Sequence, residues 1–78
     1  MSLDTAKVDE AVLGLMYLSA HHDSAVTRAW KGFDWDALDR LHERGLISDP
    51  RTKARSVILT EEGVAACRRA CESLFGAA

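Results

Sequence analysis

The chain has 78 residues, of which 47% are apolar and 28% charged, and its formal net charge is -2. A second hydrophobic core would need roughly another 100 residues, so we expect one domain over residues 1–78. The apolar share argues against intrinsic disorder. The longest apolar run, residues 11–18, is too short for a membrane span, and residues 1–7 lack a signal peptide's basic start. We therefore expect a cytoplasmic protein without membrane contact.

The first predicted helix begins near Asp4 or Thr5, either of which can cap the free N–H groups of a helix start. Leu13 and Tyr17 point away from its predicted core face, so this helix is apolar nearly all round. So short a chain has few residues to cover a second apolar side of the helix, so we predict a homodimer contact through Leu13 and Tyr17. The alternative is that the chain's own later helices cover this side. The predicted core face follows helical spacing and comprises Val8, Ala11, Val12, Leu15 and Leu18.

A turn and a short helix are predicted next. Residues 21–24 break the helical pattern, and Asp23 or Ser24 can cap a short helix over residues 25–30. Gly32, after Lys31, is the expected stop of this second helix.

The third predicted helix starts at Asp34, a capping residue, and ends at Gly45, the expected left-handed stop. Phe33, just before the cap, can pack on Leu38 as a hydrophobic staple. The side chains predicted to face inward are Trp35, Leu38, Leu41 and His42.

Two β-rich runs follow, residues 46–48 and 57–59, around a polar loop over residues 49–55 that contains the only proline. This pattern predicts a β-hairpin. Thr60 then caps a last helix, whose predicted inward face comprises Val64, Cys67, Cys71, Leu74 and Phe75.

Helix, short helix, helix, two-stranded hairpin and helix is the element order of a winged helix-turn-helix domain, mainly α with a small β-hairpin. The sequences LDRLHERGLIS (residues 38–48) and SVILTEEG (residues 56–63) flank a charged loop. Over about residues 35–65 they resemble bacterial regulators of the multiple-antibiotic-resistance and phenolic-acid-regulator kinds. In those families a leucine-bearing recognition helix ends in glycine, and the second wing strand runs into Leu-Thr-x-x-Gly. The resemblance implies a bacterial winged helix.

A second resemblance covers the full length. The run RAWKGFDWDALDRLHERGLISDP (residues 28–50) is similar to a group of short bacterial proteins whose family has no assigned function. The sequence departs from the regulators just before the third helix, where those proteins have a full second helix and a polar turn. Here the connection is short and carries Trp30, Phe33 and Trp35.

DNA-linked regulation is the function that the winged helix implies, through binding of double-stranded DNA. Recognition helices offer basic or amide side chains to base edges, but the outward strip of this third helix is Asp36, Asp39 and Glu43, which phosphates repel. The basic side chains expected to contact DNA are Arg51, Lys53 and Arg55 on the wing, Arg40 and Arg44 near the bases, and Arg28 and Lys31 at phosphates.

A protein-interaction module on the same scaffold is the alternative function. Its contacts would be the acidic strip or the aromatic group Trp30, Phe33 and Trp35, since tryptophan is enriched in the energetic centres of interfaces. Ordinary packing in the core is the other explanation for these three aromatic side chains.

We expect neither catalysis nor a metal or other cofactor. The sequence holds no recognisable triad, phosphate loop or carboxylate pair, and so short a chain can hardly enclose a substrate pocket. His42 is better explained as a hydrogen-bonded residue at the edge of the core. The possible metal ligands His21, His22, Cys67 and Cys71 lack the spacing of a zinc site, and the two cysteines are expected to be free thiols.

Overall fold

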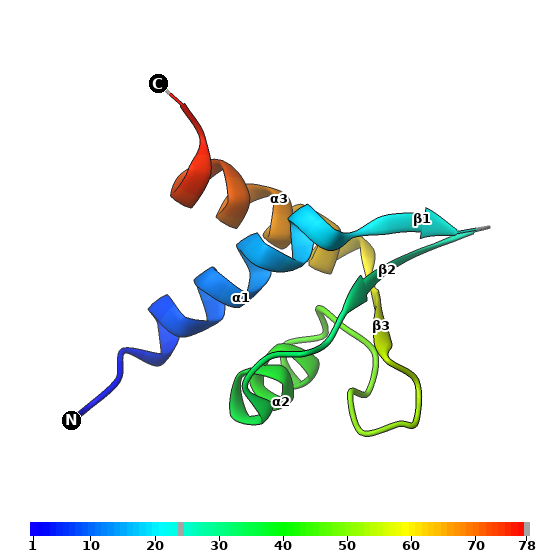
Figure 1. Ribbon diagram of the computed structural model, residues 1–78, viewed down its shortest axis with the longest axis horizontal. Helices are drawn as coiled ribbons and strands as arrows, with labels where there is room; N and C mark the ends of the chain where they lie inside the picture. The colour runs from blue at the N-terminus through cyan, green and yellow to red at the C-terminus, as the bar shows by residue number, and fades with distance from the viewer. Residues whose placement is uncertain (24, 78) are drawn as a thin grey trace.

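The computed structural model describes residues 1–23 and 25–77, and these form three helices and one three-stranded antiparallel sheet. Ser24, one of the two predicted caps, lies outside the described residues, as does Ala78. Figure 1 shows α1 and α3 meeting at an angle, with their outer ends apart, and α2 and the sheet on the other side of α1 from most of α3. In chain order the elements are α1 (Thr5–Ser19), β1 (His21–Asp23), β2 (Val26–Trp30), α2 (Trp35–Glu43), β3 (Ser56–Leu59) and α3 (Glu61–Phe75).

The predicted short helix over residues 25–30 is wrong, because this segment forms β2, the central strand of the sheet. β2 pairs with β1 on one side and with β3 on the other, where Thr27 faces Leu59 and Trp30 faces Ser56. Val26, Thr27 and Trp30 are β-branched or aromatic side chains, which favour strands. The helix-turn-helix order therefore does not occur in residues 1–23 and 25–77, and the winged-helix assignment is not confirmed.

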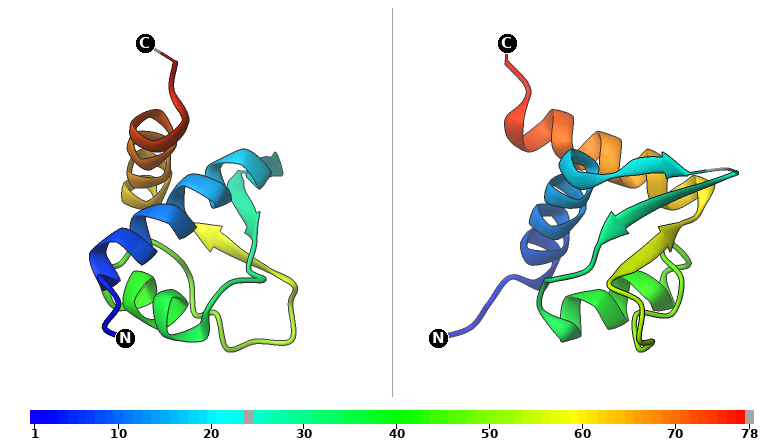
Figure 2. Two further views of the ribbon diagram at one scale, coloured as in Figure 1. Left: turned by 60° about the vertical axis from the view of Figure 1, so that its left-hand side comes forward. Right: turned by 45° about the vertical axis from the view of Figure 1, so that its right-hand side comes forward.

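The predicted two-stranded hairpin is formed only in part. Its second run is β3, but its first run contributes one isolated bridge, Ile47 with Leu59, and a hydrogen bond of 2.8 Å from Ser48 N–H to the Ile58 carbonyl. β3 pairs along its length with β2 instead. Residues 49–55 are consequently a loop beside the end of β2 (Figure 2).

The ends of α2 are confirmed. The Asp34 side chain accepts a hydrogen bond from Ala37 N–H at 3.1 Å, so it caps the helix start. Gly45, two residues after the helix end, adopts a φ of 73°, the left-handed conformation that favours glycine.

The inward face of α2 is narrower than predicted. Leu38 and Leu41 lie in the core, as expected. Trp35 and His42 do not: Trp35 is 49% exposed, and His42 is exposed with its Nδ1 3.0 Å from the Ile47 carbonyl oxygen. Trp35 is therefore available at the surface.

α1 and α3 approach closely because their shared interface holds small side chains. A Cβ on Gly14 of α1 would lie 3.1 Å from Phe75 Cε2 and 3.6 Å from the Ala70 backbone carbon. The buried residues of α3 are Gly63, Ala66, Cys67 and Ala70. They match the predicted face at Cys67, whereas Leu74 and Phe75 are exposed in the last turn.

The buried face of α1 also differs from prediction. Val12, Leu13 and Met16 are buried, whereas Leu15 and Leu18 are exposed. Leu13 is only 5% exposed and belongs to the same core cluster as Ala66 and Ala70 of α3. Burial against the chain's own last helix was the alternative explanation for the apolar second side of α1. Leu13 is therefore a core residue and not a surface contact for a second copy.

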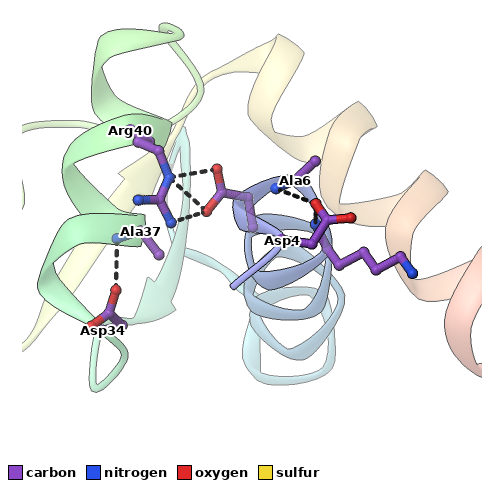
Figure 3. A network of polar contacts seen from close by, with 7 residues as sticks. Asp4, Ala6, Asp34, Ala37 and Arg40 are labelled. Carbon is purple, nitrogen blue, oxygen red and sulfur yellow. Dashed lines mark hydrogen bonds and ion pairs between the residues drawn. The ribbon is translucent and has the colours of Figure 1, made fainter. Parts of the chain in front are cut away.

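A buried ion pair joins α1 to α2. Asp9 is 5% exposed, and its carboxylate accepts hydrogen bonds from Arg40 Nε at 2.9 Å and Arg40 Nη2 at 2.7 Å (Figure 3). This two-point geometry is the strong form of an arginine–carboxylate contact. The hydrogen bonds that Arg40 donates to Asp9 raise the pKa of Arg40. Arg40, predicted to contact bases, thus holds the fold together instead.

We expect Arg40→Ala to lower the melting temperature by roughly 10 °C, because it leaves the buried Asp9 carboxylate without a partner. Arg68→Ala is the matched control, since it removes the exposed ion pair of Arg68 with Glu72, and exposed pairs contribute little. Thermal melting followed by circular dichroism measures both. Equal shifts in the two variants would contradict a structural role for the Asp9–Arg40 pair.

Two helical glycines should differ in their response to alanine. In a helix interior glycine to alanine gains about 1 kcal/mol, but a Cβ on Gly63 would overlap the Leu46 carbonyl oxygen, which already accepts from Thr60 N–H. We expect Gly63→Ala to lower the free energy of unfolding by about 2 kcal/mol. Gly14→Ala should stay within about 1 kcal/mol of the parent, because only the movable ends of side chains lie closest to it. Urea denaturation measures both, and an unchanged Gly63→Ala would contradict this packing.

Candidate nucleic-acid interface

Two half-exposed tryptophans line a hollow of about 300 Å³ between the end of β2, the start of α2 and the loop over residues 49–55. Trp30 is 53% exposed and Trp35 is 49% exposed. Large aromatic side chains at the surface, next to one another, mark a candidate binding site. The other residues that line the hollow are Lys31, Gly32, Thr52, Lys53, Ala54 and Arg55.

Strand pairing and a glycine hold Trp30 in place. Trp30 is the last residue of β2 and faces Ser56 across the sheet, and the next residue, Lys31, donates its N–H to the Arg55 carbonyl at 3.3 Å. A Cβ on Gly32 would overlap the Trp30 indole, so the ring lies directly against the Gly32 backbone. Lys31 and Gly32 thus connect a strand to α2, rather than ending a helix as predicted.

Lys31 ties the loop to this site. Its Nζ donates to the Pro50 carbonyl at 2.6 Å and to the Thr52 carbonyl at 2.9 Å. The same Nζ lies 5.9 Å from the centroid of the Trp35 ring, a distance at which the cation is attracted to the ring. Lys31 therefore places a positive charge inside the hollow while it fixes the loop.

Arg51 is largely occupied within the protein. Its guanidinium lies 5.1 Å from the Trp35 ring centroid, and its Nη2 lies 2.7 Å from the Asp39 carboxylate. The hydrogen bond from Arg51 lowers the pKa of Asp39, and the same contact raises the pKa of Arg51. Arg51 consequently positions Trp35 and offsets one acidic charge of α2.

Lys53 and Arg55 are the cations that remain available at this site. Both side chains are exposed and line the hollow. Neither forms an ion pair with any residue that the structure describes. Two exposed positive charges thus stand beside two exposed indoles.

The other predicted contact residues lie elsewhere. Arg44 lines a separate hollow of about 470 Å³ that is also bordered by Leu13 of α1 and Ala70 of α3. Arg28, in the middle of β2, has its Nε 3.9 Å from the Asp23 carboxylate. Phe33 is half-buried and packs against the core. Of the aromatic group, only Trp30 and Trp35 contribute to the candidate site.

Comparison with known proteins gives the family of the chain. The family described as "Domain of unknown function (DUF6429)" matches residues 4–77. The chain belongs to this family. It is also 51% identical over 75 residues to an uncharacterized protein of Sinorhizobium fredii. The alignment covers 96% of this chain and 92% of that protein. No solved structure matches. The resemblance to short bacterial proteins without an assigned function is thus confirmed.

The possible metal ligands His21, His22, Cys67 and Cys71 are not gathered at one place in residues 1–23 and 25–77. Cys67 is buried, and burial raises the pKa of its thiol to about 11, so it is protonated and unreactive at neutral pH. Cys71 is half-buried and also a free thiol. In residues 1–23 and 25–77 no cluster of three or more His, Cys, Asp or Glu could hold a metal ion, and no helix there could cross a membrane.

Sequence reasoning named the tryptophans and cations of the candidate site but did not bring them together. It assigned Lys53 and Arg55 to a wing and Trp30 to a separate aromatic group, as rival explanations of function. The structural residues it missed are Gly32, which supports the Trp30 ring, and Asp9, which removes Arg40 from the surface. The β-branched Val26 and Thr27 and the aromatic Trp30 were the signal that could have indicated a strand here.

Proposed function

We propose that this protein is a non-catalytic, cytoplasmic nucleic-acid-binding protein with a regulatory role. Its binding surface is the hollow at Trp30 and Trp35 together with the loop over residues 49–55. The observation that carries the proposal is that Lys53 and Arg55, both exposed, line the same hollow as the two tryptophans. Lysine and arginine that neutralise phosphates release counterions, which drives nucleic-acid binding.

The loop, and not α2, makes the contacts in this proposal. Arg40 is held by Asp9, and the remaining outward side chains near it include Asp36 and Glu43, which phosphates repel. Contacts from Lys53 and Arg55 to phosphates carry no sequence information directly. The proposed binding therefore depends on charge and on the aromatic side chains rather than on a recognition helix.

An acidic protein segment is the alternative ligand of the same surface. Half-exposed tryptophans are typical of the energetic centre of protein interfaces, and the cations around Trp30 and Trp35 would attract carboxylates. This alternative shares the residues of the first proposal, so binding to nucleic acid itself decides between them.

The test is fluorescence anisotropy of labelled nucleic acid at several salt concentrations. We expect salt-sensitive binding, and we expect Lys53→Ala with Arg55→Ala to reduce the slope of log affinity against log salt by about 1.8 on duplex DNA. Arg68→Ala with Arg69→Ala is the control, because it removes the same charge from the exposed side of α3. No binding of the parent protein at low salt would overturn the proposal in favour of a protein partner.

We also propose that the protein forms a homodimer, through a surface that replaces the predicted one. Leu18 of α1 and Phe75 of α3 are exposed. Leu18 lies one turn beyond Gly14, against which the Phe75 ring packs. Tyr17, from the predicted contact, precedes Leu18 in the chain and is 39% exposed. Burial of such side chains between copies would strengthen a domain with a small core.

Sedimentation equilibrium tests the dimer. We expect the parent protein to sediment at twice the mass of the chain, and Leu18→Asp with Phe75→Asp to sediment at the mass of one chain, because charges would be buried without partners. Leu3→Asp is the control, since Leu3 is an exposed leucine that precedes α1. A parent protein with the mass of one chain would refute the dimer.

A further inference from the structure

We infer that the nucleic acid bound at this surface is single-stranded, with an unpaired base stacked on the indole of Trp30 and adjacent phosphates contacted by Lys53 and Arg55. This inference rests on the proposed function and names its ligand. Proteins that bind single strands combine a positively charged groove with aromatic side chains on which bases stack. Both parts are present around the hollow.

Trp30 is a supported and accessible stacking surface. The residue is 53% exposed, and its ring rests against the backbone of Gly32, where no side chain intervenes. Among the residues described, no cation lies over this ring. A nucleobase can therefore reach the indole without displacing a contact of the protein.

Trp35 differs because its ring is already engaged. The guanidinium of Arg51 and the Nζ of Lys31 lie within 6 Å of its centroid, at 5.1 and 5.9 Å. Asp39 holds Arg51 in that position through its ion pair. Trp35 consequently acts as the wall of the hollow, and Trp30 is the ring that a base would contact.

The shape and charge of the surface disfavour a duplex. At about 300 Å³ the hollow has the size of the smallest ligand pockets. The bases of a duplex are stacked on one another, so their faces are not available to an indole. A second phosphate strand would add negative charge near Asp36, the exposed acid that follows Trp35 in α2, whereas one strand can follow Lys53 and Arg55 alone.

The experiment compares three labelled probes of equal length: oligothymidine, an abasic strand of the same charge, and a blunt duplex. We expect oligothymidine to bind roughly tenfold more tightly than the abasic strand, since stacking contributes about this much per base, and to bind more tightly than the duplex. We also expect it to quench tryptophan fluorescence, and Lys53→Ala with Arg55→Ala to reduce its salt slope by about 1.4.

Variants of Trp30 separate stacking from charge. Trp30→Leu should lose roughly tenfold in affinity for oligothymidine with no change for the abasic strand, and Trp30→Phe should retain most of the affinity because it keeps an aromatic face. Thermal melting checks that each variant folds. If Trp30→Leu does not fold, quenching decides, because Trp30→Phe leaves Trp35 as the reporter and should quench less than the parent.

The outcomes distinguish the two proposals. A duplex that binds as tightly as oligothymidine, or an abasic strand that binds equally well, would overturn the single-strand inference and leave nucleic-acid binding standing. Quenching by oligothymidine that is the same in the parent and in Trp30→Phe would also overturn it. Failure of all three probes to bind at low salt would remove the proposed function itself.

Discussion

A carboxylate buried between two helices needs a cationic partner, and this requirement organises much of the molecule. Asp9 on α1 is held by the forked guanidinium of Arg40 on α2, so these helices are fixed against each other. The same contact turns the central arginine of α2 inward and leaves an acidic outer side. α2 is thereby a structural element whose first residue, Trp35, lies at the edge of the candidate site.

The position of β2 in the middle of the sheet determines the rest of the site. Its pairing with β3 places Trp30 opposite Ser56, the residue that follows the basic loop. Arg55 accepts a backbone hydrogen bond from Lys31 as a consequence. Residues that are about 25 positions apart in sequence thus become neighbours, and the loop is closed at its base by sheet hydrogen bonds and at its tip by the Lys31 ammonium.

The helices could be predicted from the sequence because their ends carry local signals. Asp34 and Thr60 accept hydrogen bonds from backbone N–H groups three residues later and so cap the starts of α2 and α3. Gly45 adopts the left-handed conformation just after the end of α2. Residues 25–30 are also flanked by residues that can cap or end a helix, Asp23 and Gly32. Six residues between them are too few for helical and alternating periodicities to be distinguished. Their strand conformation depends on β3, a partner distant in sequence. The buried face of α1 was mispredicted for a related reason, because Leu13 shares its core cluster with residues of the most distant element, α3.

Two explanations that compete in the sequence become compatible in the structure. Basic residues in a loop suggest a ligand with phosphate groups, whereas exposed tryptophans suggest a flat or apolar ligand. Each set of residues alone also has an ordinary structural explanation. Trp30, Lys53 and Arg55 line one hollow, so the ligand that we propose for it carries negative charge and a planar apolar face in the same molecule. A strand with unpaired bases has this combination at every position, which is why the surface is more informative than either set of residues.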